Sequence, residues 1–352
     1  MHSQIHLQLS GDPVTPVPMS TISKVAERAG VSRTTVSHVI NHADRVSKEL
    51  RDRVNAAIEE LGYAPNPQAQ SLRTGRTDMV AVLIPDIRNP FYTEIVKAAQ
   101  DGLEKAGLEA LVYNTDVPGG HWQTHGRDYL RQLNRKRVDG LIVGEFALHG
   151  MDDALARRDT PTVFIGHLPN QSVDSVCFDY HGGGYLLGEH LAKRGHKKVV
   201  EVTGPAIFPS AMARAAGFEK ALADNGVKFT AKQRFEGSYL PPAGQEAARW
   251  IASLEGKDRP TAVFFGNYLM AMGALAEFHD QGIRIPDDIA VVIFGDLPQL
   301  EYVRPRLTRA AENPGVLAKR ATEMLLERVN GTYDGPPRSE VIPCRLQVFE
   351  SS

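Results

Sequence analysis

Apolar residues near the start of the chain recur at helical spacing in three short segments. Ile22, Val25, Ala26 and Ala29 lie at i, i+3, i+4 and i+7, which predicts a helix with one buried stripe. The same spacing returns twice downstream, first at Val36, Val39 and Ile40 and then at Val54, Ala57, Ile58 and Leu61. Gly30 suits a tight turn between the first two helices because glycine accepts a left-handed backbone. The pattern predicts a helix-turn-helix pair closed by a third helix.

A different pattern begins at Met79, where apolar runs alternate with helical stretches. Runs such as "MVAVLIPD", "VDGLIVGE", "TAVFFGN" and "IAVVIFGD" are typical of buried strands. Between them lie stretches such as "NPFYTEIVKAAQDGLEKAG" and "AMARAAGFEKALADNG". This alternation predicts parallel sheets with helices on both faces, and so many strands need two sheets and hence two lobes. Ligands in such folds bind at the carboxyl ends of the strands.

The composition is that of an ordinary globular protein. The chain has 352 residues, 42% hydrophobic and 23% charged, which is enough for two or three domains. It has no apolar run long enough to span a bilayer, and its first residues do not resemble a secretory signal. Two cysteines, Cys177 and Cys344, form neither a metal-type spacing nor a disulfide framework. These features favour a cytoplasmic protein without membrane contact, and residues 1–19 are expected to be a disordered extension or a misassigned start.

The charge is unevenly distributed. Between Thr21 and Arg76 there are nine Lys and Arg against six Asp and Glu, a balance of +3, whereas the whole chain carries −2. The rest of the chain therefore carries −5. A basic head on an acidic body is expected when one module meets phosphate and the other does not.

Catalytic and metal-binding motifs are missing from the sequence. The segment "DYHGGGYLLGEHL" opens a helix with glycines, but its spacing is not that of a dinucleotide-binding loop, and a close approach of helix and strand explains it better. We find no P-loop, nucleophile elbow or metal-ligand cluster. The sequence therefore predicts a protein that is not an enzyme and needs no cofactor or metal.

The segments "TISKVAERAGVSRTTVSHVIN" and "RVSKELRDRVNAAIEELGYAPNPQAQSLRTGRT" resemble the head of the LacI-type bacterial repressors. The resemblance runs from about Thr21 to the C-terminus. It implies an all-α helix-turn-helix head and an α/β two-lobed core of the periplasmic-binding-protein type, with two parallel doubly wound sheets. The expected limits are 20–64 for the head, 65–77 for a hinge helix and linker, and 78–352 for the core. Within the core we expect an N-lobe of about 78–173 and 309–335 and a C-lobe of about 174–308 and 336–350.

The resemblance also implies which residues of the head meet DNA. Arg33, Thr34 and His38 would face base edges in the major groove. The residues expected to contact or position against phosphate are Ser32, Thr35, Ser37, Asn41 and Ser47. The family usually has Arg at the place of His38, and His offers one donor where Arg offers two, so we expect either a relaxed base preference or a contact with the DNA backbone alone.

The segment "YAPNPQAQSLRTG" resembles the family's hinge helix. Asn66 can cap a short helix and Pro67 suits its first position. So short a helix is marginal by itself and needs DNA and a partner chain to hold it. The resemblance implies that Leu72 of each subunit wedges into the minor groove, and the alternative is a plain flexible linker.

Six residues are expected to line an effector site between the lobes. The segments "DIRNPFY", "GPAIFPSAMARAAGF", "FFGNYLMAMGAL" and "IFGD" resemble family segments that face the ligand. By that resemblance the effector-binding residues are Phe91, Tyr92, Ser210, Arg214, Asn267 and Asp296.

The cleft departs from the family at three positions that are often acidic. Gly166, Tyr268 and Gly295 stand there, while "EYVRPRLTR" adds Arg304, Arg306 and Arg309 nearby. A cleft with fewer carboxylates and more arginines favours an anionic ligand such as a sugar acid. The alternative is that these positions only repack, or that the arginines lie on the surface or at the subunit interface.

These observations together predict a homodimeric transcriptional repressor. Two heads would bind a pseudo-palindromic DNA operator, and a small-molecule effector, a sugar or sugar acid, would bind between the lobes. Two alternatives stay open: a solute-binding protein of the periplasmic type, and a regulator that responds to another metabolite such as a nucleobase.

Overall fold

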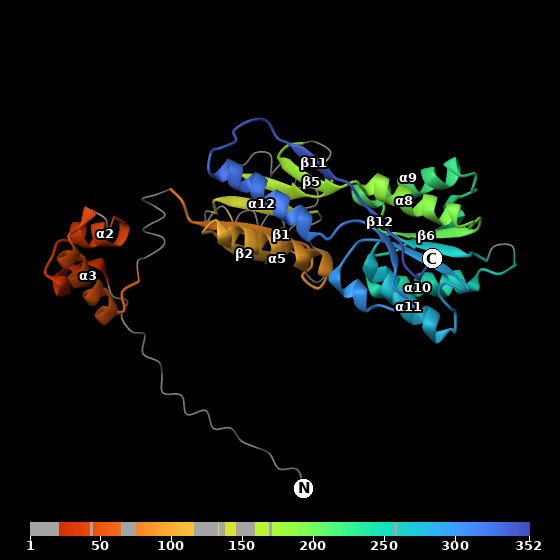
Figure 1. Ribbon diagram of the computed structural model, residues 1–352, viewed down its shortest axis with the longest axis horizontal. Coiled ribbons are helices and arrows are strands. Elements are labelled where there is room, and N and C mark those ends of the chain that lie inside the picture. The colour runs from red at the N-terminus through yellow and green to blue at the C-terminus, as the bar shows by residue number, and fades with distance from the viewer. Residues whose placement is uncertain are drawn as a thin grey trace, which may run out of the picture. The chain divides into compact units, whose positions relative to one another are not determined.

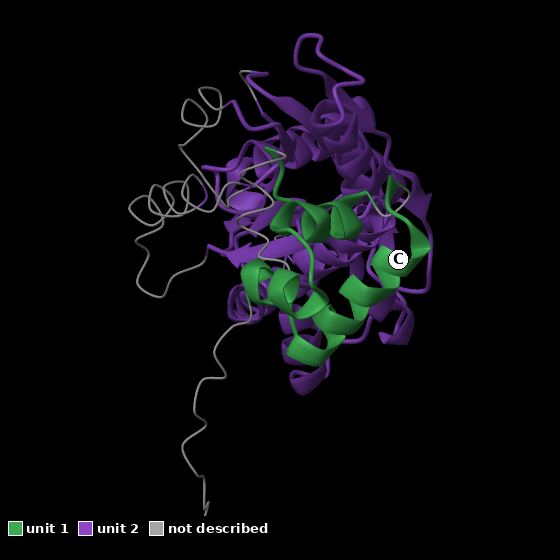
Figure 2. Cartoon of the chain, turned by 90° about the vertical axis from the view of Figure 1, so that its left-hand side faces the viewer, with its two compact units in different colours: residues 1–77 green, residues 78–352 purple. Residues whose placement is uncertain are grey.

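The computed structural model describes residues 21–42, 45–64, 75–115, 133, 138–145, 159–168, 171–256 and 259–352. The chain divides into two compact units, residues 1–77 and 78–352 (Figure 2). The predicted extension 1–19 and the hinge residues Asn66 and Leu72 lie outside the described residues.

Three helices build the first unit around a small apolar core. They are α1 (Ile22–Ala29), α2 (Arg33–Asn41) and α3 (Lys48–Leu61), and they follow the predicted apolar spacing. The buried core residues are Val25, Ala26, Ala29, Val36, Val39, Val54 and Ala57. Gly30 takes a φ of 63° at the end of α1, which keeps the turn to α2 tight.

The first lobe of the second unit is a parallel sheet of order β11-β5-β4-β3-β1-β2. Its strands are β1 (Met79–Ile84), β2 (Glu109–Asn114), β3 (Gly140–Gly144), β4 (Thr162–Ile165), β5 (Asp174–Phe178) and β11 (Ser339–Ile342). Two helices, α5 (Pro90–Lys105) and α12 (Gly315–Val329), pack side by side on one face (Figure 1). Val82 and Ile142 point to that face and Leu83 and Val143 to the other, so both faces are buried.

The second lobe is a sheet of order β12-β10-β9-β8-β6-β7. Its strands are β6 (Val199–Thr203), β7 (Arg234–Glu236), β8 (Ala262–Phe265), β9 (Ala290–Phe294), β10 (Thr308–Ala310) and the antiparallel edge strand β12 (Leu346–Gln347). Four helices cover it, α8 (Tyr180–Lys193) with α9 (Pro209–Asp224) on one face and α10 (Pro241–Ser253) with α11 (Tyr268–Asp280) on the other. Short 3₁₀ helices span Ala231–Gln233 and Pro298–Tyr302. The two sheets and the helical head confirm the predicted fold class.

The lobe limits differ from those predicted at three strands. β5 pairs with β4 in the first sheet, although the predicted C-lobe begins at residue 174. β10 pairs with β9 in the second sheet, although the predicted N-lobe resumes at 309. β11 pairs with β5 in the first sheet, although 336–350 were expected in the C-lobe. An apolar run shows that a strand is buried but not which sheet edge it joins, so the pattern could not place these limits.

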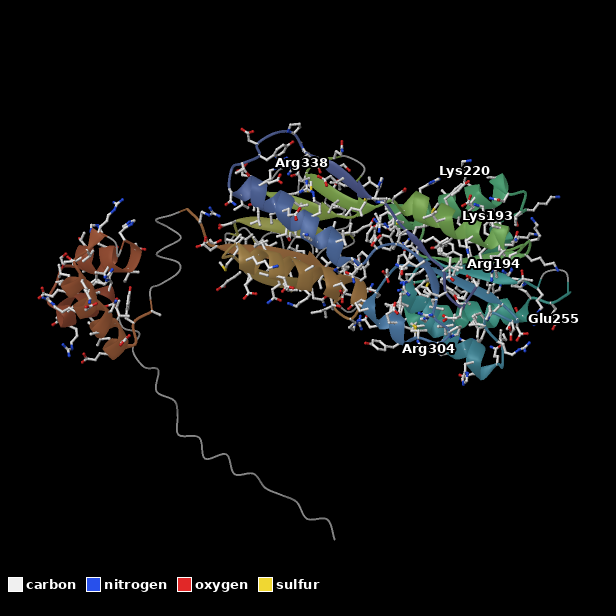
Figure 3. The ribbon with its side chains drawn as sticks, in the orientation of Figure 1. Lys193, Arg194, Lys220, Glu255, Arg304 and Arg338 are labelled. Atoms are coloured by element: carbon white, nitrogen blue, oxygen red, sulfur yellow. The ribbon has the colours of Figure 1, made fainter. Side chains whose placement is uncertain are left out.

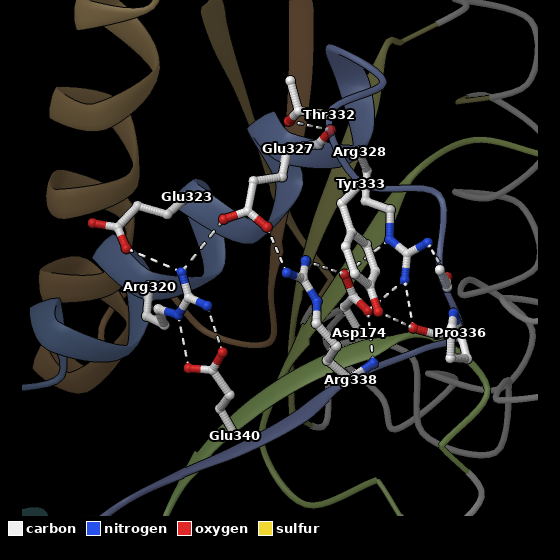
Figure 4. A network of polar contacts seen from close by, with 11 residues as sticks. Asp174, Arg320, Glu323, Glu327, Arg328, Thr332, Tyr333, Pro336, Arg338 and Glu340 are labelled. Carbon is white, nitrogen blue, oxygen red and sulfur yellow. Dashed lines mark hydrogen bonds and ion pairs between the residues drawn. The ribbon is translucent and has the colours of Figure 1, made fainter.

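A network of charged side chains joins β5 and β11 of the first sheet to α12 and the loop that follows it (Figure 4). Asp174, at the start of β5, is 2% exposed and receives hydrogen bonds from Arg328 and Arg338. The ring of Tyr333 lies beside both guanidinium groups, 4.4 and 3.8 Å from its centroid. Burial pushes the pKa of Asp174 upward, but the two arginines outweigh it and hold the pKa below its usual value.

Candidate functional site: a DNA-reading helix and an interlobe cleft

The exposed side of α2 carries most of the residues predicted to meet DNA. Arg33, Thr34 and His38 are exposed, and Ser37 and Asn41 are half-buried beside them at helical spacing. Val36 and Val39 occupy the opposite, buried side. The helix therefore presents one polar face, the side by which a recognition helix meets the major groove.

Ser32 and Ser47 cap the N-terminal ends of two helices in this unit. The Ser32 Oγ accepts a hydrogen bond from Thr35 N at 3.0 Å and lies 2.9 Å from the Thr35 hydroxyl, so it caps α2. The Ser47 Oγ accepts from Leu50 N at 3.4 Å and caps α3. Their cap bonds define where the two helices begin, and both side chains stay exposed for a further contact.

The ring of His38, on α2, packs edge to face against the ring of His42, the residue that follows this helix. Their centroids lie 6.2 Å apart. The predicted alternatives for His38, a base contact or a backbone contact, are both compatible with this exposed position.

A cleft between the two lobes of the second unit gathers all six residues predicted for the effector. Seven aromatic rings line it: Phe91, Tyr92, Phe178, Tyr180, Tyr239, Tyr268 and Phe294. The polar lining residues include Asn89, Glu145, Ser210, Arg214, Asn267, Asp296 and Glu312. Aromatic walls with a few convergent polar groups are the usual make-up of a small-molecule site.

Arg214, near the start of α9, is the cation at the centre of this lining. It is 8% exposed and donates to the backbone oxygens of Ser210 at 3.2 Å and Gly266 at 2.7 Å and to the Tyr239 hydroxyl. Its guanidinium carbon lies 4.8 Å from the ring centroid of Phe294. The cation is therefore fixed by backbone bonds and by the faces of rings, and its position is set before any ligand binds.

Glu145 directly follows β3 and is one of the carboxyl groups that line the cleft. It is 8% exposed, and its Oε1 has no hydrogen-bond partner among the described residues. Burial raises the pKa of Glu145 to about 7, against the lowering effects of the Ser210 hydroxyl and of Arg214. Ser210 and Arg214 belong to the other lobe, so Glu145 faces the opposing lobe across the cleft.

Two tyrosines frame Glu145 and Arg214. The Tyr92 hydroxyl donates to the backbone oxygen of Glu145 at 3.0 Å, and burial raises the pKa of this tyrosine well above its usual value. Tyr239 has a φ of 66°, an unusual conformation for a residue other than glycine. Its ring lies against Phe208, with 6.2 Å between centroids, and its hydroxyl accepts from Arg214. Such backbone strain is often found where a side chain is held for function.

Asn267 and Asp296 line the cleft but are already engaged inside the second lobe. The Asn267 side chain accepts from Met270 N at 3.0 Å and donates to the Tyr239 backbone oxygen at 2.9 Å. Asp296 lies 2.8 Å from Arg309 and accepts from Gln347 at 3.0 Å. Both residues therefore shape the wall of the cleft, and a ligand would have to share these contacts.

The three arginines expected near the cleft do not line it. Arg309 is 3% exposed and is paired with Asp296 and Glu301. Arg306 binds Glu350, and the exposed Arg304 donates to backbone oxygens of its own loop (Figure 3). The prediction of an anionic ligand assumed that these arginines face the cleft, and that assumption is wrong. Side chains along a strand and its loop point in different directions, so nearness in sequence does not place them in the cleft.

The expected loss of carboxylates from the cleft is also not observed. Tyr268 and Gly295 do line it, but Glu145, Asp296 and Glu312 provide three carboxyl groups. Gly166 explains one of them: it has a φ of 142°, and a Cβ there would lie 2.6 Å from the Cβ of Glu145. The glycine leaves the room that the Glu145 side chain occupies.

Several lining residues were missed by the sequence analysis. Glu145 was detectable as a charged residue at the carboxyl end of the buried run "VDGLIVGE", where ligands bind in such folds. Tyr180 and Tyr239 come from segments far apart in the chain, and no local pattern marks them as ligand-facing. Phe294 lies in the quoted segment "IFGD" but was not singled out. Only the crossing of the chain between the lobes brings them together.

Among the described residues, no helix is long and apolar enough to cross a membrane. In the same part of the chain, no group of three His, Cys, Asp or Glu side chains could hold a metal ion. The absence of catalysis and of a cofactor stays a prediction.

A helix-turn-helix unit on a chain with a two-lobed, cleft-forming core defines a DNA-binding regulator of the ligand-responsive class. The model "Bacterial regulatory proteins, lacI family" matches residues 21–66, and the model "Periplasmic binding protein-like domain" matches residues 189–352. The HTH-type transcriptional repressor PurR of Photobacterium profundum is 35% identical over 314 residues, which cover 88% of this chain and 92% of the relative. The chain belongs to the LacI family of bacterial regulatory proteins.

Solved structures agree with this assignment. The lac repressor dimer bound to operator and the anti-inducer ONPF superposes with a TM-score of 0.81 at 27% identity, covering 95% of this chain and 99% of that one. The transcriptional regulator CelR in complex with cellobiose gives a TM-score of 0.68 at 28% identity, covering 95% of this chain and all of that one (100%). The resemblance found in the sequence is confirmed over nearly the whole chain.

Proposed function

We propose that this protein is a homodimeric, cytoplasmic transcriptional repressor. Its two heads bind a pseudo-palindromic double-stranded operator, and a small molecule in the interlobe cleft changes the affinity of that binding. The observation that carries this proposal is the exposed polar face of α2, a capped helix whose other side packs on the apolar core of the head. The similarity to a PurR repressor and to an operator-bound repressor supports it.

We assign base contacts and phosphate contacts to different residues of the head according to their side chains. Arg33, Thr34 and His38 are exposed and long enough, or close enough to the helix start, to reach base edges. The residues proposed to fix the register on phosphate are Ser32, Thr35, Ser37, Asn41 and Ser47. Residues 65–77, with Asn66 and Leu72, are proposed to form the hinge that contacts the minor groove.

For the effector we propose a neutral, planar ring compound such as a nucleobase. Seven aromatic rings line the cleft, and flat rings stack well on aromatic faces. Arg214 is the one cation among the described lining residues and is already bonded, whereas three carboxyl groups share the cleft. This balance disfavours an anion such as a sugar acid. A neutral sugar is the second candidate, since CelR binds cellobiose on the same fold.

The effector acts through the equilibrium between lobe arrangements. A ligand held by Tyr92 and Glu145 on one side and Ser210 and Arg214 on the other binds the closed arrangement more tightly than the open one. It can shift operator affinity only by that difference, which in comparable systems is about 1–3 kcal/mol.

Selection of duplexes from a random DNA library tests the DNA-binding role. We expect an enriched pseudo-palindrome with two half-sites. The Arg33→Ala variant should bind that duplex about 1–3 kcal/mol more weakly and relax the preference at one base pair in each half-site. Arg249→Ala, a substitution on α10 in the core, is the matched control and should select the same duplex. No enrichment, with or without added metabolites, would refute the proposal.

A further inference from the structure

One buried polar atom in the cleft has no partner. The Oε1 of Glu145 is buried and receives no hydrogen bond from the described residues, although the side chain is only 8% exposed. Buried polar atoms are almost always hydrogen-bonded, because leaving one unpaired is costly, and more so for a charged group. Because this unpaired atom lies inside a ligand cleft, a bound ligand could supply the missing hydrogen bond.

Several donors lie near the carboxyl group of Glu145, but none of the described residues donates a hydrogen bond to its Oε1. The Ser210 hydroxyl, the Arg214 guanidinium and the backbone N–H groups of His167 and Ser210 lie near this carboxyl, and each of them lowers its pKa. The other titratable groups acting on it or affected by its charge are Tyr92 on α5, Cys177 on β5, Tyr180 on α8 and Tyr239. Protonation relieves the cost of the unpaired charge, which agrees with the raised pKa of about 7.

We propose that Glu145 selects the effector by accepting a hydrogen bond at Oε1 from an N–H group of a ring compound, and that binding releases one proton from Glu145 to solvent. This inference rests on the proposed function. A bond from N–H to an ionised carboxylate is stronger than a neutral one, and the nearby Arg214 favours the ionised form. The ligand class is therefore narrowed to rings with a polarised N–H at their edge, such as cyclic amides and amidines.

Binding calorimetry on the full chain tests the proposal, with adenine, hypoxanthine, uracil and cytosine as ring probes and ribose and cellobiose as sugar probes. We expect a ring probe to bind with a heat that depends on the ionisation enthalpy of the buffer, which reports the released proton. Its Kd should weaken as the pH falls below about 7, by up to about tenfold per pH unit, and level off above.

Variants separate the hydrogen bond from the proton. Glu145→Gln keeps an amide oxygen at the same place, so binding should persist while both the proton release and the pH dependence vanish. Glu145→Ala should weaken binding at pH 8 by about tenfold or more. Glu201→Gln changes another buried glutamate, one paired with Arg234 outside the cleft, and should leave the pH dependence unchanged. Thermal melts of each variant check that it is folded.

The outcomes distinguish the two proposals. A ring probe that binds Glu145→Gln with the wild-type pH dependence overturns the role of Glu145 but not the effector class. Binding of sugar probes alone refutes the proposed ring class, and proton release on sugar binding that Glu145→Gln abolishes would keep Glu145 as the acceptor. Failure of every probe to bind the wild type overturns the inference, while duplex selection still decides the DNA-binding role.

Discussion

At the scale of single residues, Gly166 leaves the space that the Glu145 side chain occupies in the cleft. Gly166 has a φ of 142°, and any Cβ at this position would meet the Cβ of Glu145 at 2.6 Å. The backbone conformation excludes a larger residue here, and the space is used by a buried carboxyl instead. The cleft therefore retains an acidic group, supplied by the residue after β3 rather than by the residue after β4.

The first prediction concerns this pair. Gly166→Ala should be destabilising both through its backbone and through the clash with Glu145. Gly107→Ala is the matched control, because Gly107 has a φ of 74° but open space around its Cβ position. In urea unfolding, Gly166→Ala should cost about 1–3 kcal/mol more than Gly107→Ala. Equal costs would show that Glu145 does not press on this site.

A second prediction concerns the start of α2. Removal of the Ser32 cap bond to Thr35 N should destabilise the first turn of this helix by about 1 kcal/mol. Ser32→Ala should therefore speed hydrogen exchange at the amides of α2, while Ser32→Asn, which can still cap, should not. Equal exchange in both variants would mean that the cap contributes nothing to the helix.

The sequence predicted residues that lie in local motifs and missed those that do not. Ser210 and Arg214 share one helix, so a single quoted segment placed both of them in the cleft. Arg309 was misjudged because proximity in sequence does not fix direction: it points into the second lobe, toward Asp296 and Glu301. Tyr239 reaches the cleft through a strained turn, and no spacing signals that conformation.

At the scale of elements, small residues set how closely the helices approach. A Cβ on Gly217 of α9 would lie 1.9 Å from the backbone oxygen of His181 in α8, and one on Gly184 would lie 2.1 Å from the backbone oxygen of Arg214. The glycines of "DYHGGGYLLGEHL" thus serve close packing, as predicted. Gly183 packs against the strand residue Phe294, whereas Gly184 packs against the helix α9. This contact fixes the helix that carries Arg214.

The third prediction follows from this contact. Gly217→Ala should force α8 and α9 apart and destabilise the protein by about 1–3 kcal/mol, and it should also weaken effector binding because Arg214 moves. Ala216→Ser, at the exposed neighbouring position, should change stability by less than about 0.5 kcal/mol. Urea unfolding and binding calorimetry measure the two effects. A stable Gly217→Ala variant would contradict the close packing described here.

A fourth prediction concerns the charge network that joins β5, β11 and α12. Asp174→Asn would leave Arg328 and Arg338 without their buried carboxylate, and we expect a loss of about 3 kcal/mol. Since the folded-state pKa of Asp174 is lowered, its contribution is present above the unfolded pKa and is lost as the pH falls through the folded one. Wild-type stability should therefore drop on acidification, and the drop should be smaller in the variant. Parallel slopes would contradict this role.

At the scale of the whole molecule, the fold class was predictable and the lobe limits were not. Alternating strands and helices predict two doubly wound sheets because each buried strand needs cover on both faces. β11 joins the first sheet and β12 joins the second because of contacts between segments far apart in the chain, such as Arg328 with Asp174. No local sequence pattern predicts such contacts. The cleft exists only through these crossings, so its full lining could not be read from the chain.

A small molecule in the cleft is proposed to control DNA binding by the head. The most direct measurement is the affinity of the full chain for its selected duplex, at fixed salt, with and without each cleft-binding probe. We predict a change of at least about fivefold with one probe, abolished in Arg214→Ala, while the probe-free affinity of that variant stays within a fewfold of wild type. A probe that binds the cleft and leaves DNA affinity unchanged in the wild type would contradict the account.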